Sequence, residues 1–135
     1  MFDHLGFYTA GDLRERGAFY TAVLGALGHR LLEDHTQPDG GGWLVFGSGQ
    51  PHSAFFVVAK GRPERWSALQ QPGLSPIHIA FRAPSKESVD RFHATGLRKG
   101  AINNGDPGVR RAPYYCCFLL DADGNNIEAG AYFDD

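Results

Sequence analysis

The sequence predicts an α+β fold built from two similar halves, each with the order strand, helix and three strands. The 135 residues are 42% hydrophobic and 21% charged, which is the composition of one globular domain. Hydrophobic patterns typical of strands and helices occur twice in the same order. Matching positions repeat at nearly constant spacing, since His4 and His78 lie 74 positions apart and Phe19 and Phe92 lie 73 apart. Because one such half leaves a sheet face uncovered, two halves packed together account for the repeat.

The first half covers residues 1–60 and opens with an alternating strand at residues 2–8. Asp12 and Glu15 stand at capping-box spacing and predict the start of a helix. The apolar stripe of this helix consists of Phe19, Tyr20, Val23, Leu24 and Leu27. Clusters of Gly and Pro then separate three predicted strands, at residues 29–35, 42–47 and 53–59.

The second half covers residues 76–135 and follows a linker at residues 61–75, which is rich in Pro and Gly. A second alternating strand is predicted at residues 76–82. Ser85 predicts the start of a helix that buries Val89 and Phe92 and closes at Gly96. Three further strands are predicted at residues 99–103, 114–120 and 126–132.

Charge and cysteine content exclude several classes of protein. The net charge of −2 lacks the basic excess of a nucleic-acid binder. The longest apolar stretch, residues 114–120, is too short to span a bilayer, and no basic segment leads into an apolar one as in a signal peptide. Cys116 and Cys117 are neighbours and cannot form an unstrained disulfide, so we expect a reduced, cytoplasmic protein.

Three side chains at matching positions suggest a metal site. His4 and His78 lie in the first strand of each half, and Glu128 lies in the last strand, in phase with Asn126. A carboxylate within a strand is rarely buried unless it is paired or binds a metal. Two imidazoles and one carboxylate on a concave face would hold a divalent ion and leave positions open for a ligand. The alternatives are that the histidines are hydrogen-bonded interior residues and that Glu128 forms a buried ion pair with Arg82 or Arg110.

Other polar residues are candidates for binding a substrate. Those predicted on the same inner face are Tyr8, Arg82, Asn126 and Tyr132. Arg110, predicted in a loop, would bind an acidic group of a substrate. The alternative is that the first four fill a partly hydrated interior and that Arg110 is only solvated. The remaining histidines are expected at the surface or in loops: His29, His35, His52 and His93.

The residues 121–125, Asp-Ala-Asp-Gly-Asn, superficially resemble a calcium loop, but the glycine is misplaced and no helix follows. They instead predict a hairpin turn with Gly124 or Asn125 in the left-handed conformation.

Three blocks of sequence, taken in order, resemble a known superfamily. They are residues 3–25 with Asp-His-Leu-Gly, Asp-Leu and Phe-Tyr; residues 76–81, Pro-Ile-His-Ile-Ala-Phe; and residues 120–129, Leu-Asp-Ala-Asp-Gly-Asn-Asn-Ile-Glu-Ala. The chain resembles the glyoxalase / bleomycin-resistance / extradiol-dioxygenase superfamily, the vicinal oxygen chelate proteins. The resemblance implies two βαβββ modules, a cupped eight-stranded mixed sheet, frequent homodimers, and metal ligands on the first and last strands of each module.

Carried over by position, the implied ligands are His4, His78 and Glu128. The fourth ligand would fall on residues 53–58, where Phe55, Phe56 and Val57 cannot bind a metal. This departure argues against four-ligand glyoxalase I activity. A set of three ligands, two His and one Glu, instead resembles the sites of extradiol dioxygenases and manganese fosfomycin-modifying enzymes. Two hypotheses follow. The first is an enzyme of the lyase, isomerase or dioxygenase class that uses Fe, Mn, Ni or Zn to act on a small molecule with neighbouring oxygens. The second is a metal-free protein of the bleomycin-resistance type that binds and sequesters a small molecule.

Overall fold

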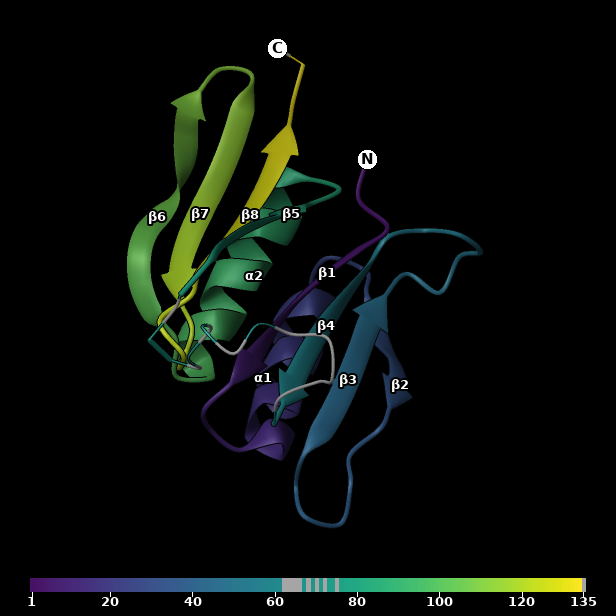
Figure 1. Cartoon of the computed structure of the whole chain (residues 1–135). Helices are drawn as coiled ribbons and strands as arrows, with labels where there is room; N and C mark the ends of the chain where they lie inside the picture. The colour runs from purple at the N-terminus through teal and green to yellow at the C-terminus, as the bar shows by residue number, and fades with distance from the viewer. Residues whose placement is uncertain (62–66, 68, 70, 72, 75, 135) are drawn as a thin grey trace.

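The computed structural model describes residues 1–61, 67, 69, 71, 73–74 and 76–134. The predicted linker therefore lies largely outside the described residues. The described residues form two sheets of four strands and two helices (Figure 1). The predicted α+β class with two βαβββ modules is confirmed, and the eight strands are divided between two sheets that share no strand pairing.

The first sheet, called sheet A here, has the strand order β1-β4-β3-β2. Its strands are β1 (His4–Thr9), β2 (Arg30–Asp34), β3 (Gly42–Gly47) and β4 (Phe55–Lys60). β1 runs parallel to β4, and the other pairs are antiparallel. Burial along β1 does not follow the predicted alternation: the strand is exposed at its start, where Leu5 is 41% exposed, and buried from Phe7 to its end.

The second sheet, called sheet B here, repeats this topology in the order β5-β8-β7-β6. Its strands are β5 (His78–Arg82), β6 (Ile102–Arg111), β7 (Tyr114–Leu120) and β8 (Asn126–Tyr132). β5 runs parallel to β8, so His78 and Glu128 lie on neighbouring strands. His4 and His78 therefore occupy equivalent places at the start of the edge strands of two different sheets.

The helices begin at the predicted caps. α1 (Leu13–Gly25) follows Asp12, whose Oδ1 accepts a hydrogen bond from the Glu15 amide at 3.0 Å. α2 (Lys86–Arg98) follows Ser85, whose hydroxyl accepts from the Ser88 amide at 3.2 Å. Each cap satisfies an amide that the first turn leaves unpaired, which determines where the helix starts. Neither helix in the described residues is long and apolar enough to cross a bilayer.

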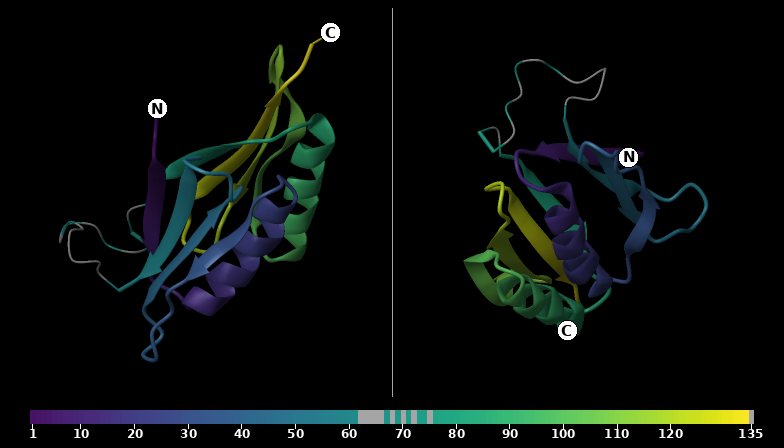
Figure 2. Two further views of the ribbon diagram at one scale, coloured as in Figure 1. Left: turned by 90° about the vertical axis from the view of Figure 1, so that its right-hand side faces the viewer. Right: turned by 90° about the horizontal axis from the view of Figure 1, so that it is seen from below.

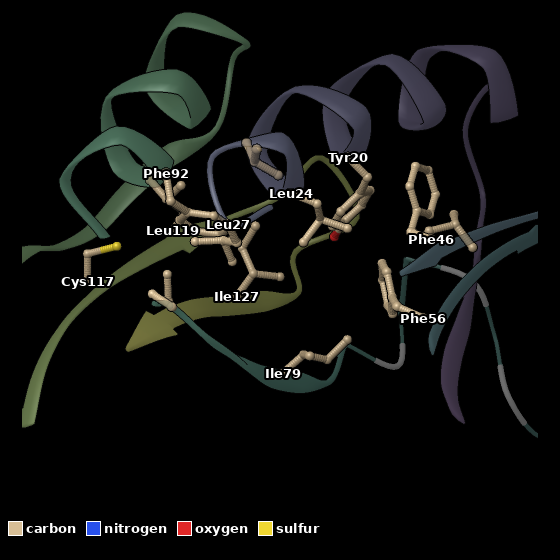
Figure 3. Close-up of a cluster of buried hydrophobic side chains, with 14 of the residues drawn as sticks. Tyr20, Leu24, Leu27, Phe46, Phe56, Ile79, Phe92, Cys117, Leu119 and Ile127 are labelled. Carbon is tan, nitrogen blue, oxygen red and sulfur yellow. The ribbon is translucent and has the colours of Figure 1, made fainter. Parts of the chain in front are cut away.

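Both helices lie on the same side of the molecule and pack against each other as well as against their own sheets (Figure 2). One continuous core results, in which large side chains from both halves meet (Figure 3). The fully buried members include Tyr20, Phe46, Phe92, Leu119 and Ile127. Because the helices cover one face of each sheet, the opposite face, called the open face here, is left without a helix within the described residues.

β6 differs from its prediction, which ended at Asn103. The strand continues to Arg111 because it pairs with β7 through three register shifts, around Gly105 and Gly108 and before Arg111. Gly and Pro in this stretch predict a loop locally, but bulges let the strand absorb the extra residues while keeping long-range pairing.

The turn between β7 and β8 joins the two modules. Gly124 adopts a φ of +81°, which confirms the predicted left-handed turn. The buried carboxylate of Asp123 accepts hydrogen bonds from the Thr9 hydroxyl at 2.7 and 2.8 Å and from the Ala10 amide at 3.2 Å. Arg16 on α1 donates to the same carboxylate at 2.9 Å. This network ties the second module to the end of β1.

Candidate functional site

The open face of sheet B carries a histidine–carboxylate pair. His78 begins β5, and Glu128 in β8 lies opposite Ala80. His78 Nε2 lies 3.2 Å from Glu128 Oε2. Glu128 is only 7% exposed, whereas about half of the His78 side chain is exposed. A buried acid thus lies beside an accessible imidazole.

The other ring nitrogen of His78 determines how this pair is polarised. Nδ1 lies 2.9 Å from the backbone carbonyl oxygen of Asn126, which can only accept, so Nδ1 carries the proton in this bond. In a neutral ring, Nε2 then directs a lone pair toward Glu128 Oε2. A lone pair and a carboxylate oxygen repel at this separation unless a proton or a metal cation lies between them. The pair is therefore arranged to hold a positive charge.

Tyr114 on β7 holds the second oxygen of Glu128. Its hydroxyl donates to Glu128 Oε1 at 2.8 Å. The ring reaches this position because it lies over Gly130, where a Cβ would collide with the Tyr114 hydroxyl. Burial, and then the hydrogen bond to Glu128, raise the pKa of Tyr114 well above its usual value, so the phenol remains a donor at neutral pH. Glu128 is thus held from both sides.

Cys116, Phe118 and Arg110 continue this face beside Glu128. Phe118 pairs with Glu128 across the two strands, and its ring centroid lies 6.4 Å from that of His78. Arg110 lies over the Phe118 ring, with Cζ 5.8 Å from the centroid. Burial raises the pKa of the Cys116 thiol; Glu128 raises it further and Arg110 lowers it, so both charged groups lie close to this thiol. Cys116 therefore remains a protonated thiol that packs between Glu128 and Arg110.

Three other predicted residues lie at the margins of this face. Arg82 stacks on Tyr132 with Cζ 4.8 Å from the ring centroid, and Tyr132 is 55% exposed. Asn126 Oδ1 accepts from the Asn104 amide at 3.3 Å. Within the described residues neither Arg82 nor Arg110 forms an ion pair with Glu128, so the alternative of an arginine partner does not hold and His78 is the partner.

His4 and Tyr8 lie elsewhere, on β1 of sheet A. His4 Nδ1 contacts Asp3 Oδ2 at 2.7 Å, and its ring stacks on Phe55 with centroids 4.7 Å apart. Tyr8 is buried at 3% exposure. The repeat explains the separation, because equivalent positions of the two modules belong to different sheets. Within the described residues no three ligand-type side chains come together in one chain, so the structure brings together His78 and Glu128 but not His4.

The residues that are brought together fit a divalent cation as two of its ligands. An imidazole nitrogen and a carboxylate oxygen suit Fe, Mn, Ni and Zn alike. The bond from His78 Nδ1 to a backbone carbonyl is the arrangement that usually orients a metal-binding histidine. The third ligand of a facial set would have to come from outside this face of the chain.

A groove with a volume of about 1010 Å³ lies on the open face of sheet A. The residues that line it include His4 of β1, Trp43 of β3, and Phe55 and Lys60 of β4. Trp43 is 42% exposed and stacks with His35, with ring centroids 4.5 Å apart. The groove is large enough for a small organic molecule and offers aromatic faces to it.

Sequence reasoning missed Tyr114 and Cys116 as neighbours of Glu128. Their alternation with Phe118 in β7 was visible, but their contact with Glu128 depends on the register with β8. The expected surface location of His93 is also wrong. This residue is 8% exposed on the inner side of α2, where it contacts Asn103 of β6.

Comparison with known proteins places this fold in context. No family model matches the chain, and no curated protein matches it. Among solved structures, a glyoxalase/bleomycin resistance protein from Albidiferax ferrireducens T118 is 26% identical, with a TM-score of 0.74 and 98% of each chain covered. TnmS3, an antibiotic binding protein from Streptomyces sp. CB03234, is 20% identical with a TM-score of 0.68, covering 97% of this chain and 94% of the other. A lactoylglutathione lyase from Agrobacterium tumefaciens is 19% identical with a TM-score of 0.66, covering 97% and 92%.

The likeness extends over 98% of the chain and therefore spans both modules. The neighbours include both enzymes and a binding protein, so they identify the fold without selecting one activity. The chain is thus a member of the glyoxalase / bleomycin-resistance / dioxygenase superfamily, the vicinal oxygen chelate proteins.

Proposed function

We propose that the chain is a divalent-metal-dependent enzyme of the lyase, isomerase or dioxygenase class that acts on a small molecule with two neighbouring oxygens. The observation that carries this proposal is the orientation of His78. Its Nδ1 is bonded to a carbonyl, and its Nε2 faces Glu128 Oε2 at 3.2 Å. Two electron-rich atoms directed at the same space are the expected geometry of two ligands of one cation.

His4 completes the ligand set in this proposal, and it comes from a second copy of the chain. Sheet A and sheet B each have an open face, and the equivalent residues His4 and His78 lie on these two faces. A two-fold dimer that brings sheet A of one copy against sheet B of the other produces two identical sites and closes without further contacts. Each site would then contain His4 of one copy with His78 and Glu128 of the other.

The chain's own residues have distinct tasks in such a site. A bound ion would supply Lewis acidity, stabilising negative charge on the substrate's oxygens. His78 and Glu128 would hold the ion, and Tyr114 keeps Glu128 oriented by donating to its other oxygen at 2.8 Å. Arg82, Asn126 and Tyr132 lie at the margins of the same face, where they would contact the substrate.

A metal-free binding protein is the second candidate, favoured by the groove on sheet A. The exposed Trp43 and the Phe55 ring offer stacking surfaces in a volume of about 1010 Å³. Such a site would bind a small molecule by burial and stacking without chemistry at His78.

Metal binding separates the two candidates. Protein purified without chelators should contain about one equivalent of Fe, Mn, Ni or Zn per chain, and Glu128→Ala should lower the affinity for Mn²⁺ or Zn²⁺ by roughly 100-fold or more, since a site of three ligands loses one. His52→Asn is the matched control, because His52 is exposed and asparagine tolerates its φ of 58°. Absence of binding, or equal affinity in wild type and Glu128→Ala, would contradict the enzyme and favour the binding protein.

A mixing experiment tests the shared site. His4→Ala and Glu128→Ala proteins should each lose metal binding. After unfolding and refolding together, half of the dimers are mixed, and each mixed dimer has one intact site, so about a quarter of the wild-type metal content should return. If the three ligands acted within one chain, the mixture would bind no more than its components.

A further inference from the structure

Arg110 is an exposed cation on the open face of sheet B. Its Cζ lies 5.8 Å from the Phe118 ring centroid, and it lies close enough to Cys116 to lower the pKa of that thiol. Among the described residues no carboxylate lies within ion-pair distance of its guanidinium. Glu128, the nearby acid, is already engaged by His78 and Tyr114. An exposed guanidinium on an aromatic ring beside a satisfied acid is available to an anion.

A chain of hydrogen bonds leads from Arg110 into the interior. Arg110 Nη2 donates to the backbone oxygen of Asp106 at 2.7 Å. The side chain of Asp106 accepts from Asn103 Nδ2 at 2.7 Å. Asn103 Oδ1 in turn lies 2.9 Å from Nε2 of the buried His93 on α2. The guanidinium is therefore linked to a helix residue in the core by three hydrogen bonds.

The direction of these bonds follows from the chemistry of the amide. Asn103 Oδ1 also accepts from the Gly105 amide at 3.0 Å, which identifies it as the oxygen, so the opposite Nδ2 faces Asp106. Because Oδ1 can only accept, His93 Nε2 donates to it. All partners have complementary roles, so the arrangement is a satisfied network rather than a set of coincident contacts.

The same network shapes the irregular part of β6. The strand shifts its register between Asn103 and Gly105 and again before Gly108. A Cβ at Gly105 would lie 2.8 Å from the Phe118 ring and 3.1 Å from Arg110 Nη2, so glycine leaves the space that the guanidinium occupies over Phe118. The Phe118 ring, the space left by Gly105 and the hydrogen bonds that lead to His93 thus all favour the same position of the Arg110 side chain.

We propose that Arg110 binds an anionic group of the ligand, a carboxylate or a phosphonate, and that buried His93 positions Arg110 through Asn103 and Asp106. This inference rests on the proposed function for the place of the ligand, because the anion would lie beside the His78–Glu128 pair. A planar guanidinium binds either group through two parallel hydrogen bonds. His93 acts here as a positioning residue and does not touch the ligand.

The test follows the Arg110 side chain directly by ¹⁵N NMR, with Arg110→Lys used to assign its Nε–H signal. The signal should be ordered in the wild type, should become as mobile as that of exposed Arg14 in His93→Leu, and should be restored in His93→Gln, whose amide can still donate. Asn103→Ala breaks the same network at an exposed position and should have the effect of His93→Leu, which keeps the test valid if the buried variant fails to fold. An Arg110 signal that is mobile in the wild type, or unchanged in Asn103→Ala, would overturn the positioning role.

Anion binding is measured separately, with acetate and methylphosphonate titrated at constant ionic strength. At least one of the two anions should shift the Arg110 signal. A shift with acetate alone indicates a carboxylate ligand, a shift with methylphosphonate alone indicates a phosphonate, and a shift with both indicates that either group is bound. Affinity is read in every variant from the backbone amide signal of Phe118, whose ring lies under the Arg110 guanidinium. It should fall about tenfold in Asn103→Ala, as expected for one charge-assisted contact whose donor is no longer held, and should be lost in Arg110→Gln. Equal affinity in Arg110→Gln would overturn the anion site. Metal titration of the wild-type protein tests the proposed function alone, so the two ideas can fail independently.

Discussion

Replacing Asp123 by alanine should strongly destabilise the protein, because this carboxylate joins segments that lie far apart in the sequence. Thr9 and Asp123 are 114 positions apart and are joined by hydrogen bonds of 2.7 and 2.8 Å. The Ala10 amide and Arg16 Nε donate to the same carboxylate at 3.2 and 2.9 Å. The side chains of Arg16 and Asp123 are only 14% and 4% exposed, so solvent screens the pair little.

The magnitude follows from what remains after the carboxylate is removed. Arg16 becomes a nearly buried charge without its partner, and the Thr9 hydroxyl and Ala10 amide lose an acceptor. Removing one member of a buried ion pair costs about 3–5 kcal/mol, so we expect a loss of about 4 kcal/mol in the free energy of unfolding. For a domain of this size, that corresponds to a decrease in Tm of about 15 °C.

Urea unfolding followed by circular dichroism measures this loss. The double variant Asp123→Ala/Arg16→Ala should lose about 2 kcal/mol less than the sum of the single variants, because both remove the same interaction. Asp134→Ala, at an exposed site, is the control and should remain within about 0.5 kcal/mol of the wild type. A loss below about 1 kcal/mol for Asp123→Ala, or additive single losses, would refute the reasoning that this network holds the two modules together.

Three further predictions concern the two thiols, the core ring of Phe92 and the imidazole of His29. Burial raises the pKa of Cys117 to about 12 and also raises that of Cys116, so iodoacetamide at pH 8 should label both thiols only as fast as the protein unfolds; faster labelling would argue against burial. Phe92→Ala should lower the free energy of unfolding by about 3–5 kcal/mol in urea titrations, since this ring is fully buried, and a small loss would mean that the core closes over the cavity. Burial lowers the pKa of His29 from its ordinary value of 6.5, so the folded state resists protonation. Stability should therefore fall as the pH drops below 6.5, and His29→Gln should flatten that dependence between pH 7 and 5; an unchanged slope would exclude this origin.

Local signals in the sequence were sufficient for most secondary structure. Asp12 and Ser85 begin the helices because a side chain that satisfies the first amides acts within a few residues. The predicted strand limits at residues 42–47, 114–120 and 126–132 coincide with β3, β7 and β8. β6 was underestimated because its glycines and proline indicate a loop locally, whereas pairing with β7 is a long-range interaction that overrides this preference.

The candidate site shows a similar division between local and distant information. Alternation along β8 predicts that Glu128 and Asn126 lie on one face of the sheet, and they do so in the structure. The sequence grouped Glu128 with His4 and His78 and left Arg82 or Arg110 as alternative partners, and only the tertiary structure selected His78 among them. His93 was misplaced for a related reason: an isolated histidine on a helix shows no sign that a partner such as Asn103 lies across from it.

The sequence by itself determined the order of the elements, their repetition and the side chains that share a face of each strand. These properties depend on periodicity and capping, which act over a few residues. Only the tertiary structure decided that His78 and Glu128 meet while His4 lies on another sheet. That outcome depends on strand register and on how the two modules pack through their helices, and both arise from contacts between residues far apart in the chain.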